Sequence, residues 1–192
     1  MVSMPTRQRT IKKWLDYLAE TNGEVAALEI GRVHSPNETV GHSTVVIARH
    51  PAVKRLVSID INAATEYVAR ELLGEEIQKV EFINADSFSA LEKLLLRGDT
   101  FDFLYLDGAS DAEICFTDFM GALNVSREGS IIVLDDTDPK CDVKGNLTVP
   151  WAEEHGDIVE IVDRVPSGPD SNGQTVLRVL IPGVFECGPM HT

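Results

Sequence analysis

The chain has 192 residues, 43% of them hydrophobic, which suffices for one domain with a full core. Its 31 acidic residues outnumber 17 lysines and arginines, giving a formal net charge of −14 at pH 7. A field of that sign repels nucleic-acid phosphates and anionic membranes, so we expect neither as a partner. The basic cluster of Arg7, Arg9, Lys12 and Lys13 is interpreted as a solvated helix face.

Cysteine usage and hydropathy favour a cytoplasmic protein. Cys115, Cys141 and Cys187 are odd in number and lack metal-ligand spacing, which suits free thiols in a reducing compartment. The sequence shows neither a signal peptide nor an apolar run of membrane-spanning length. We therefore expect a soluble chain that stays in the cytoplasm.

The elements up to residue 134 are expected to alternate between helix and strand. An amphipathic helix over 6–20 places Ile11, Trp14, Leu15 and Leu18 on one face and ends at Asn22-Gly23. Near-continuous apolar runs, typical of doubly buried strands, then alternate with helical patterns. The strands are expected at 25–30, 55–59, 80–84, 101–106 and 130–134, and the helices at 42–50, 62–73, 87–96 and 111–124. This order predicts a parallel sheet with helices on both faces.

The pattern changes after residue 134. A polar loop over 135–149 leads into a short helix over 151–155. Strands at 158–162 and 175–181 follow, joined by a turn at 166–173 without an intervening helix, which predicts an antiparallel hairpin. The fold class is therefore α/β, a doubly wound Rossmann-like sheet of five parallel strands plus a C-terminal antiparallel hairpin. We expect one domain: an N-terminal helix in 1–22, a cofactor-binding core in 25–181 and a tail in 182–192.

Acidic residues stand at the ends of the first three predicted strands. Glu29 precedes Gly31, and Gly41-His42-Ser43-Thr44 opens the next helix, so the turn allows close approach of a ligand to the backbone. Asp60 closes the second strand, where an acid accepts hydrogen bonds from ribose hydroxyls. Asp86 has two interpretations, a helix cap or a contact with an adenine edge. His42 likewise is either a ligand contact or a surface residue.

Three further aspartates follow the fourth and fifth strands. Asp107 ends the run over 101–106, and Asp135 and Asp136 follow the run over 130–134. Neighbouring parallel strands bring these carboxylates together, so either a proton or a cation must lie between them. Hard oxygen ligands favour Mg²⁺, Ca²⁺ or Mn²⁺. The alternative is a solvated acidic loop. The whole scheme depends on Glu29, Asp60 and Asp107 meeting around one cleft.

In this order the motifs resemble the class I S-adenosylmethionine-dependent methyltransferases. The similarity is greatest to the small O-methyltransferase branch that includes the catechol, caffeoyl-CoA and macrocin enzymes, and it covers roughly residues 25–181. The motifs are Ala27-Leu28-Glu29-Ile30-Gly31, Gly41-His42-Ser43-Thr44, Val57-Ser58-Ile59-Asp60, Asn84-Ala85-Asp86-Ser87, Phe101-Asp102-Phe103-Leu104-Tyr105-Leu106-Asp107-Gly108 and Ile131-Ile132-Val133-Leu134-Asp135-Asp136.

The resemblance implies a role for each of these residues. Glu29 and Gly31 would flank the methionine part of S-adenosylmethionine, Asp60 would hold the ribose, and Asp86 and Ser87 would bracket the adenine. The full cofactor set is Glu29, Gly31, His42, Ser43, Asp60, Asn62, Asp86, Ser87 and Asp107. The metal set is Asp107, Asp135 and Asp136.

The catalytic base departs from the family pattern. The catechol-type enzymes carry a lysine shortly after the acid that matches Asp107, whereas here the run Gly108-Ala109-Ser110-Asp111 has none. Asp111 and Lys140 are possible substitutes beside Asp107 as the catalytic group.

Three functions remain open at this stage. The first is metal-assisted O-methylation of a small hydroxylated acceptor. The second is a catalytically inactive relative that works through protein contacts, which the missing base favours. The third is a nicotinamide-dependent oxidoreductase, which is disfavoured because no G-x-G-x-x-G follows the first strand. A homodimer formed through the N-terminal helix or the tail over 185–192 is also expected to be possible.

Overall fold

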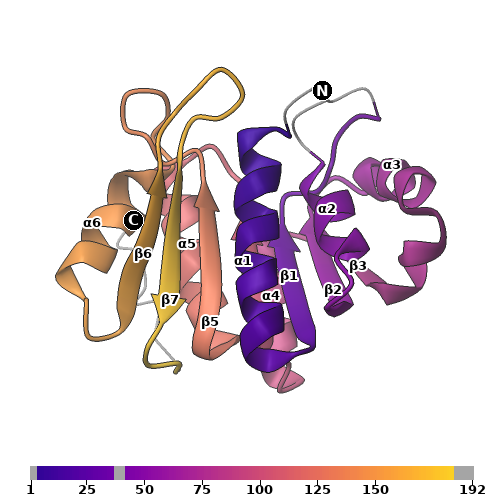
Figure 1. Cartoon of the computed structure of the whole chain (residues 1–192), viewed down its shortest axis with the longest axis horizontal. Coiled ribbons are helices and arrows are strands. Elements are labelled where there is room, and N and C mark those ends of the chain that lie inside the picture. Colours follow the sequence, from indigo (N-terminus) through magenta and orange to yellow (C-terminus); the bar gives the residue numbers. More distant parts are fainter. Residues whose placement is uncertain (1–3, 37–41, 184–192) are drawn as a thin grey trace.

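A computed structural model describes residues 4–36 and 42–183. Its helices and strands follow the predicted alternation (Figure 1). The helices are α1 (Thr6–Asn22), α2 (Ser43–Arg49), α3 (Ala64–Leu73), α4 (Ser87–Leu96), α5 (Ala112–Asn124) and α6 (Gly145–Glu154), with a 3₁₀ helix, η1 (Gly74–Lys79). The strands are β1 (Val25–Ile30), β2 (Val53–Asp60), β3 (Val80–Asn84), β4 (Phe101–Leu106), β5 (Ser126–Asp135), β6 (Val159–Val165) and β7 (Gln174–Val179). Gly41 and residues 184–192 of the tail lie outside the described residues.

The strands form one seven-stranded sheet in the order β3-β2-β1-β4-β5-β7-β6. Strands β1 to β5 pair in parallel, whereas β7 lies antiparallel to both β5 and β6. This arrangement confirms the predicted doubly wound sheet with a terminal hairpin. The carboxyl ends of β1 to β5 share the upper edge of the sheet in Figure 1, and the β6–β7 connection rises beside them.

The register aligns the ends of the central strands. Ile30 of β1 lies opposite Ile59 of β2 and Leu106 of β4, and Leu106 lies opposite Leu134 of β5. The residues that follow these positions therefore leave the sheet at the same level. Open α/β sheets bind ligands beyond this edge, at the point where the strand order changes direction. In this sheet that point lies between β1 and β4.

Several element boundaries differ from the sequence prediction. Strand β5 begins at Ser126 instead of residue 130, because Ser126 already pairs with Phe101 of β4, before a register shift that contains Gly129 at a φ of +83°. Helix α6 begins at Gly145, six residues before the predicted start, although Pro150 lies inside it. Proline inside a helix removes one backbone donor, which explains why this segment reads as a loop in the sequence.

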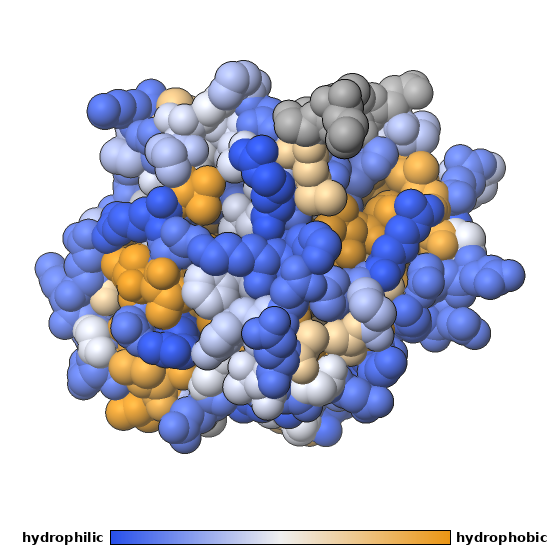
Figure 2. Space-filling view, in the orientation of Figure 1, coloured by the Kyte–Doolittle hydropathy of each residue, from blue (hydrophilic) through white to orange (hydrophobic). Residues whose placement is uncertain are grey.

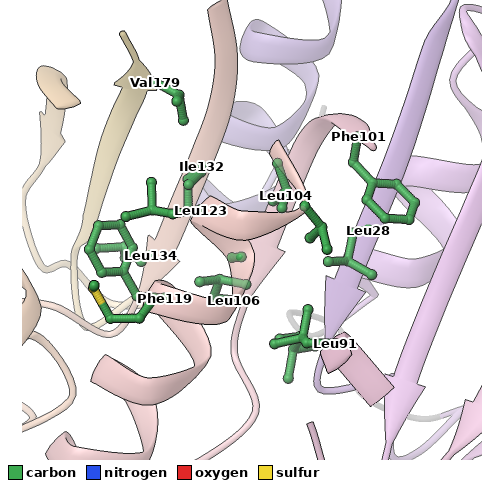
Figure 3. Packing of buried hydrophobic residues seen from close by; sticks show 14 of the residues in the cluster. Leu28, Leu91, Phe101, Leu104, Leu106, Phe119, Leu123, Ile132, Leu134 and Val179 are labelled. Carbon is green, nitrogen blue, oxygen red and sulfur yellow. The ribbon is translucent and has the colours of Figure 1, made fainter. Parts of the chain in front are cut away.

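The core fills both faces of the sheet. One cluster packs α4, α5 and α6 against residues such as Leu28, Leu104 and Ile132 (Figure 3). The other packs α1, α2 and α3 against the opposite face, and the four predicted apolar residues of α1 are all buried in it. Over α1 the visible surface is mostly hydrophilic, with hydrophobic patches on either side (Figure 2). Within the described ranges, no helix has the length and hydropathy needed to cross a membrane.

The two-sided core predicts a large cost for truncating a central strand residue. Leu104 is 0% exposed between helix and sheet, so Leu104→Ala should lower the free energy of unfolding by about 2–5 kcal/mol. Leu96 is 83% exposed at the end of α4, so Leu96→Ala should change it by less than about 0.5 kcal/mol. Urea denaturation of both variants measures the difference. Equal costs would contradict this account of the core.

Candidate active site

A cavity of about 370 Å³ opens at the carboxyl ends of β1 to β4. Five of the residues predicted to bind a cofactor line it: Gly31, Asp60, Asn62, Asp86 and Ser87. Most of the other lining residues are apolar or small, namely Ile30, Ile59, Ile61, Ala85, Gly108, Ala109 and Ile114, together with His34 and Asp118. Its size and its mixture of apolar walls with a few polar groups are typical of a small-molecule site.

Gly31 is where the chain turns out of β1 and passes the end of β4. Its φ of +89° lies in the left-handed region, and a Cβ there would lie 2.3 Å from the carbonyl oxygen of Asp107. The Gly31 amide donates to the Ile59 carbonyl, and the Asp107 amide donates to the Ile30 carbonyl. Only glycine combines this conformation with such close backbone approach, so the predicted glycine turn has a clear structural cause.

The Asp60 carboxylate is held by backbone amides at the floor of the turn. It accepts from the amide of Arg32 at 2.9 Å and from the amide of Asn62 at 2.7 Å. Each carboxylate oxygen can accept more than one hydrogen bond, so Asp60 keeps acceptor capacity toward the cavity that it lines. The fixed orientation is what a ribose-binding acid requires.

Glu29 is completely buried beside the cavity and does not line it. Its carboxylate accepts from the hydroxyls of Ser43 at 2.5 Å, Thr44 at 2.7 Å and Ser58 at 2.8 Å. Burial raises the pKa of Glu29 to about 7, and the three hydroxyls oppose that rise. The structure thus pairs two residues of the predicted cofactor set, Glu29 and Ser43, with each other, and neither lines the cavity. The prediction that Glu29, Asp60 and Asp107 meet around one cleft is wrong, because only Asp60 lines the cavity while the other two carboxylates bond to residues of the chain.

Arg32 is a buried residue that the sequence analysis did not identify. It is 1% exposed, and its guanidinium donates to the Ser58 hydroxyl and carbonyl and to the Asn84 side chain. The guanidinium also lies 4.8 Å from the centre of the Phe82 ring. Arg32 therefore links the turn after β1 to β2 and β3. No local pattern marks it, because these partners lie 26 to 52 residues away.

The three predicted aspartates do converge beyond β4 and β5. Asp107, Asp135 and Asp136 each offer an oxygen within 4.8 Å of the others. Lys144 donates to Asp107 at 2.7 Å and to Asp136 at 2.9 Å. Arg7 of α1 lies 2.5 Å from Asp136, 3.0 Å from Asp135 and 3.7 Å from Asp107. For Arg7 the predicted solvated helix face is wrong, because its side chain is only 19% exposed within this ion-pair cluster.

Burial and charge act differently on the members of this acidic cluster. Burial, and then the neighbouring Asp107 charge, raise the pKa of Asp135 to about 8. For Asp136 burial opposes the effect of Lys144 and Arg7, and the two cations prevail and lower its pKa. Tyr105 and Gln174 donate to the Asp135 carboxylate at 2.9 and 3.0 Å. The three carboxylates are therefore extensively paired with, and largely neutralised by, residues of the chain itself.

The remaining predicted site residues lie apart from these contacts. Asp111 is the N-cap of α5 and accepts from the amides of Glu113 and Ile114. Lys140 is exposed, and Lys144 is the lysine that reaches the aspartates. His42 lines a groove between α1 and α2 instead of the cavity. Asp86 caps α4 through the Ser89 amide, which confirms one of its two interpretations, and it also lines the cavity, while the adenine contact stays a prediction.

A second, much smaller cavity of about 20 Å³ lies beside the acidic cluster. Asp135 and Lys144 line it, and Gly108 and Asp118 line both this cavity and the large one. That volume holds about one water molecule. The acidic cluster thus adjoins the large cavity, and the space next to it is small.

One known protein family matches the part of the sequence that forms most of this site. A family model described as a methyltransferase domain matches residues 38–137, just over half of the chain. No curated protein gives a significant sequence match.

Solved structures resemble the whole fold. The O-methyltransferase from Bacillus cereus, in complex with SAH, is 22% identical with a TM-score of 0.67 over 93% of this chain and 82% of that one. Cofactor-bound Rv0187 from MTB is 24% identical with a TM-score of 0.69 over 93% and 81%. The O-methyltransferase TomG from Streptomyces achromogenes, in complex with SAM, is 25% identical with a TM-score of 0.65 over 88% and 79%.

The buried Glu29 carboxyl predicts a distinctive pH dependence of stability. Its raised pKa means that its contribution is fully present below about pH 4.5 and is lost as the pH rises through about 7. The free energy of unfolding should fall by up to about 1.4 kcal/mol per pH unit in that window relative to Glu29→Gln, which keeps the shape without the charge. Urea titrations at several pH values compare the two proteins. Parallel curves would contradict the burial of a titrating carboxyl.

Proposed function

The chain belongs to the methyltransferase domain family, and we propose that it transfers the methyl group of S-adenosylmethionine to a hydroxyl oxygen of a small molecule. The observation that carries this proposal is the cavity at the carboxyl ends of β1 to β4, with Gly31 at the turn and Asp60 on its wall. The Bacillus cereus and Streptomyces achromogenes enzymes, which share the fold, bind SAH and SAM. Both are O-methyltransferases, which supports S-adenosylmethionine as the cofactor and oxygen as the acceptor atom.

The reaction needs alignment more than covalent help. A lone pair of the acceptor oxygen attacks the sulfonium methyl in line, the carbon–sulfur bond breaks with its electrons going to sulfur, and S-adenosylhomocysteine leaves. Holding donor and acceptor in that geometry supplies much of the rate enhancement. The hydroxyl proton has to leave toward the acidic cluster, whose Asp107 is the member most exposed, at 22% of its side chain. Asp60 orients the donor through its ribose.

The acidic cluster fits a divalent cation by the chemistry of its donors. Asp107, Asp135 and Asp136 would hold Mg²⁺, Ca²⁺ or Mn²⁺, and the bound ion would stabilise the negative charge that develops on the acceptor oxygen. Lys144 and Arg7 already contact the same carboxylates. We infer that an added cation competes with the Lys144 ammonium, because both need Asp107 and Asp136.

A second candidate function is a relative that binds the cofactor without transferring methyl groups. The observation that favours it is the small size, about 20 Å³, of the space beside the acidic cluster. An acceptor larger than water requires that space to open. Saturating S-adenosylmethionine binding combined with silence across a panel of phenols, catechols and sugar hydroxyls would support this candidate over the first.

The proposed cofactor can be tested by measuring ligand binding. S-adenosylhomocysteine should bind to the wild type in calorimetric titration, whereas NADH should not. Asp60→Asn should weaken binding by roughly tenfold or more, because hydrogen bonds to a charged group are worth about 1.5–3 kcal/mol. Asp157→Asn, an exposed acid on the α6–β6 connection, is the matched control and should bind like the wild type. Absence of heat at millimolar ligand would refute the proposal.

The proposed cation site can be tested by measuring metal binding. Lys144→Met removes the competing ammonium, so Mn²⁺ measured by equilibrium dialysis should bind roughly tenfold tighter or more, since one opposing charge within a few ångströms is lost. Lys140→Met, the exposed lysine four residues earlier, is the control and should leave Mn²⁺ binding unchanged. An Mn²⁺ affinity insensitive to Lys144→Met would show that the ion does not use these carboxylates.

A further inference from the structure

Asp118 of α5 is a buried acid with an unsatisfied oxygen. The residue is 3% exposed, and its Oδ1 has no hydrogen-bond partner among the described residues. Burial raises the pKa of Asp118 to about 6, opposed by a hydrogen bond with the Ser87 side chain. A buried carboxyl oxygen left without a donor costs free energy, so such an atom calls for a partner that the chain does not supply.

The position of Asp118 indicates that this partner comes from the large cavity. Asp118 lines the large cavity together with Ser87, at the part of the wall formed by the residues after β3. Gly108 separates it from β1, and a Cβ on that glycine would lie 3.5 Å from Asp118 Oδ2. Because Gly108 has no side chain, nothing on that residue covers Oδ2 of the carboxyl group from the cavity, whereas Oδ1 is buried and is reached only by close approach of a partner.

The other residues that line the cavity indicate how a nucleoside would lie in it. Asp60 marks the ribose position, and the base then extends toward the ends of β3 and α5. Ile61 and Ile114 line this region and are 79% and 49% exposed, which leaves two apolar surfaces for a flat ring. Asp86, the other acid there, uses its Oδ1 to cap α4 through the Ser89 amide.

We propose that Asp118 recognises the base of the methyl donor, its Oδ1 accepting a hydrogen bond from the exocyclic amine of adenine. This inference rests on the proposed function, since it takes the cavity to hold an adenosyl group. It assigns to α5 a specificity-determining residue. The amine distinguishes adenine from hypoxanthine, which carries an oxygen at the same position and would set that oxygen against the carboxylate.

The test compares two ligands that differ only at that position, S-adenosylhomocysteine and S-inosylhomocysteine. Calorimetry on the wild type should show the adenosyl compound binding roughly 100-fold tighter or more, because a site built for a hydrogen-bond donor rejects the analogue that lacks it. Asp118→Asn should reduce this preference to less than about tenfold, since an amide can turn its own donor toward the hypoxanthine oxygen.

Two control variants separate recognition from structure. Glu113→Gln makes the same acid-to-amide change on the exposed face of α5 and should keep the wild-type preference. Thr148→Val removes another unpartnered buried oxygen, Thr148 Oγ1, which belongs to a residue lining the small cavity that Asp118 also lines. It should keep the preference too, whereas its loss there would mean that Asp118 serves the small cavity.

The outcomes are distinct. If neither ligand binds to the wild type, the proposed function fails. If S-adenosylhomocysteine binds but the wild type accepts S-inosylhomocysteine equally well, or if Asp118→Asn keeps the full preference, the role of Asp118 is overturned. Should Asp118→Asn not fold, Asp118→Glu, which keeps the charge but moves the oxygens, takes its place and should lower the preference for the adenosyl compound, and a wild-type ratio below about tenfold overturns the role of Asp118 by itself.

Discussion

The arrangement of the sheet edge at the carboxyl ends of β1 and β2 depends on the burial of the Glu29 carboxyl group among three hydroxyls. Because a buried acid needs donors, Ser43 and Thr44 at the start of α2 and Ser58 of β2 must approach the end of β1. The partners are themselves tied to the turn, since Thr44 accepts from the Val33 amide and Ser58 from the Arg32 guanidinium. The path of the chain after β1, and therefore the shape of the cavity, follows from this network.

The two halves of the sheet satisfy buried charge in different ways. Around β1 and β2 the acids are satisfied mainly by hydroxyls and backbone amides, so Asp60 stays available to the cavity. Beyond β4 and β5 three aspartates face a lysine and an arginine, and ion pairing leaves little space between them. A cavity of about 370 Å³ therefore lies beside Asp60, whereas only about 20 Å³ lies beside the aspartate cluster. Under the proposed function, binding of the methyl donor and entry of the acceptor would depend on these two separate parts of the sheet edge.

The sequence reveals the sheet and the acids at its edge, because both depend on local patterns. Buried parallel strands are continuous apolar runs, and the residues after them meet at one edge whatever their neighbours are. The partners of those acids follow no such pattern. Arg7 lies about 130 residues from Asp136 along the chain and looks like any other basic residue on a helix surface. Lys144 and Asp118 are likewise defined only by what the fold places against them, and the orientation of Glu29 away from the cavity is a matter of side-chain packing.

Strand β7 runs antiparallel to both of its neighbours, β5 and β6, and this direction places its start at the edge of the sheet where β5 ends. An antiparallel strand begins where parallel ones end, so Gln174, the first residue of β7, reaches Asp135, and the connection over 166–173 lies against Thr137 and Asp138, which follow the aspartate pair. Among the described residues, none that lines the cavity of about 370 Å³ comes from that hairpin. A change in the length or composition of the connection would therefore act on the aspartate cluster and leave the lining of that cavity in place.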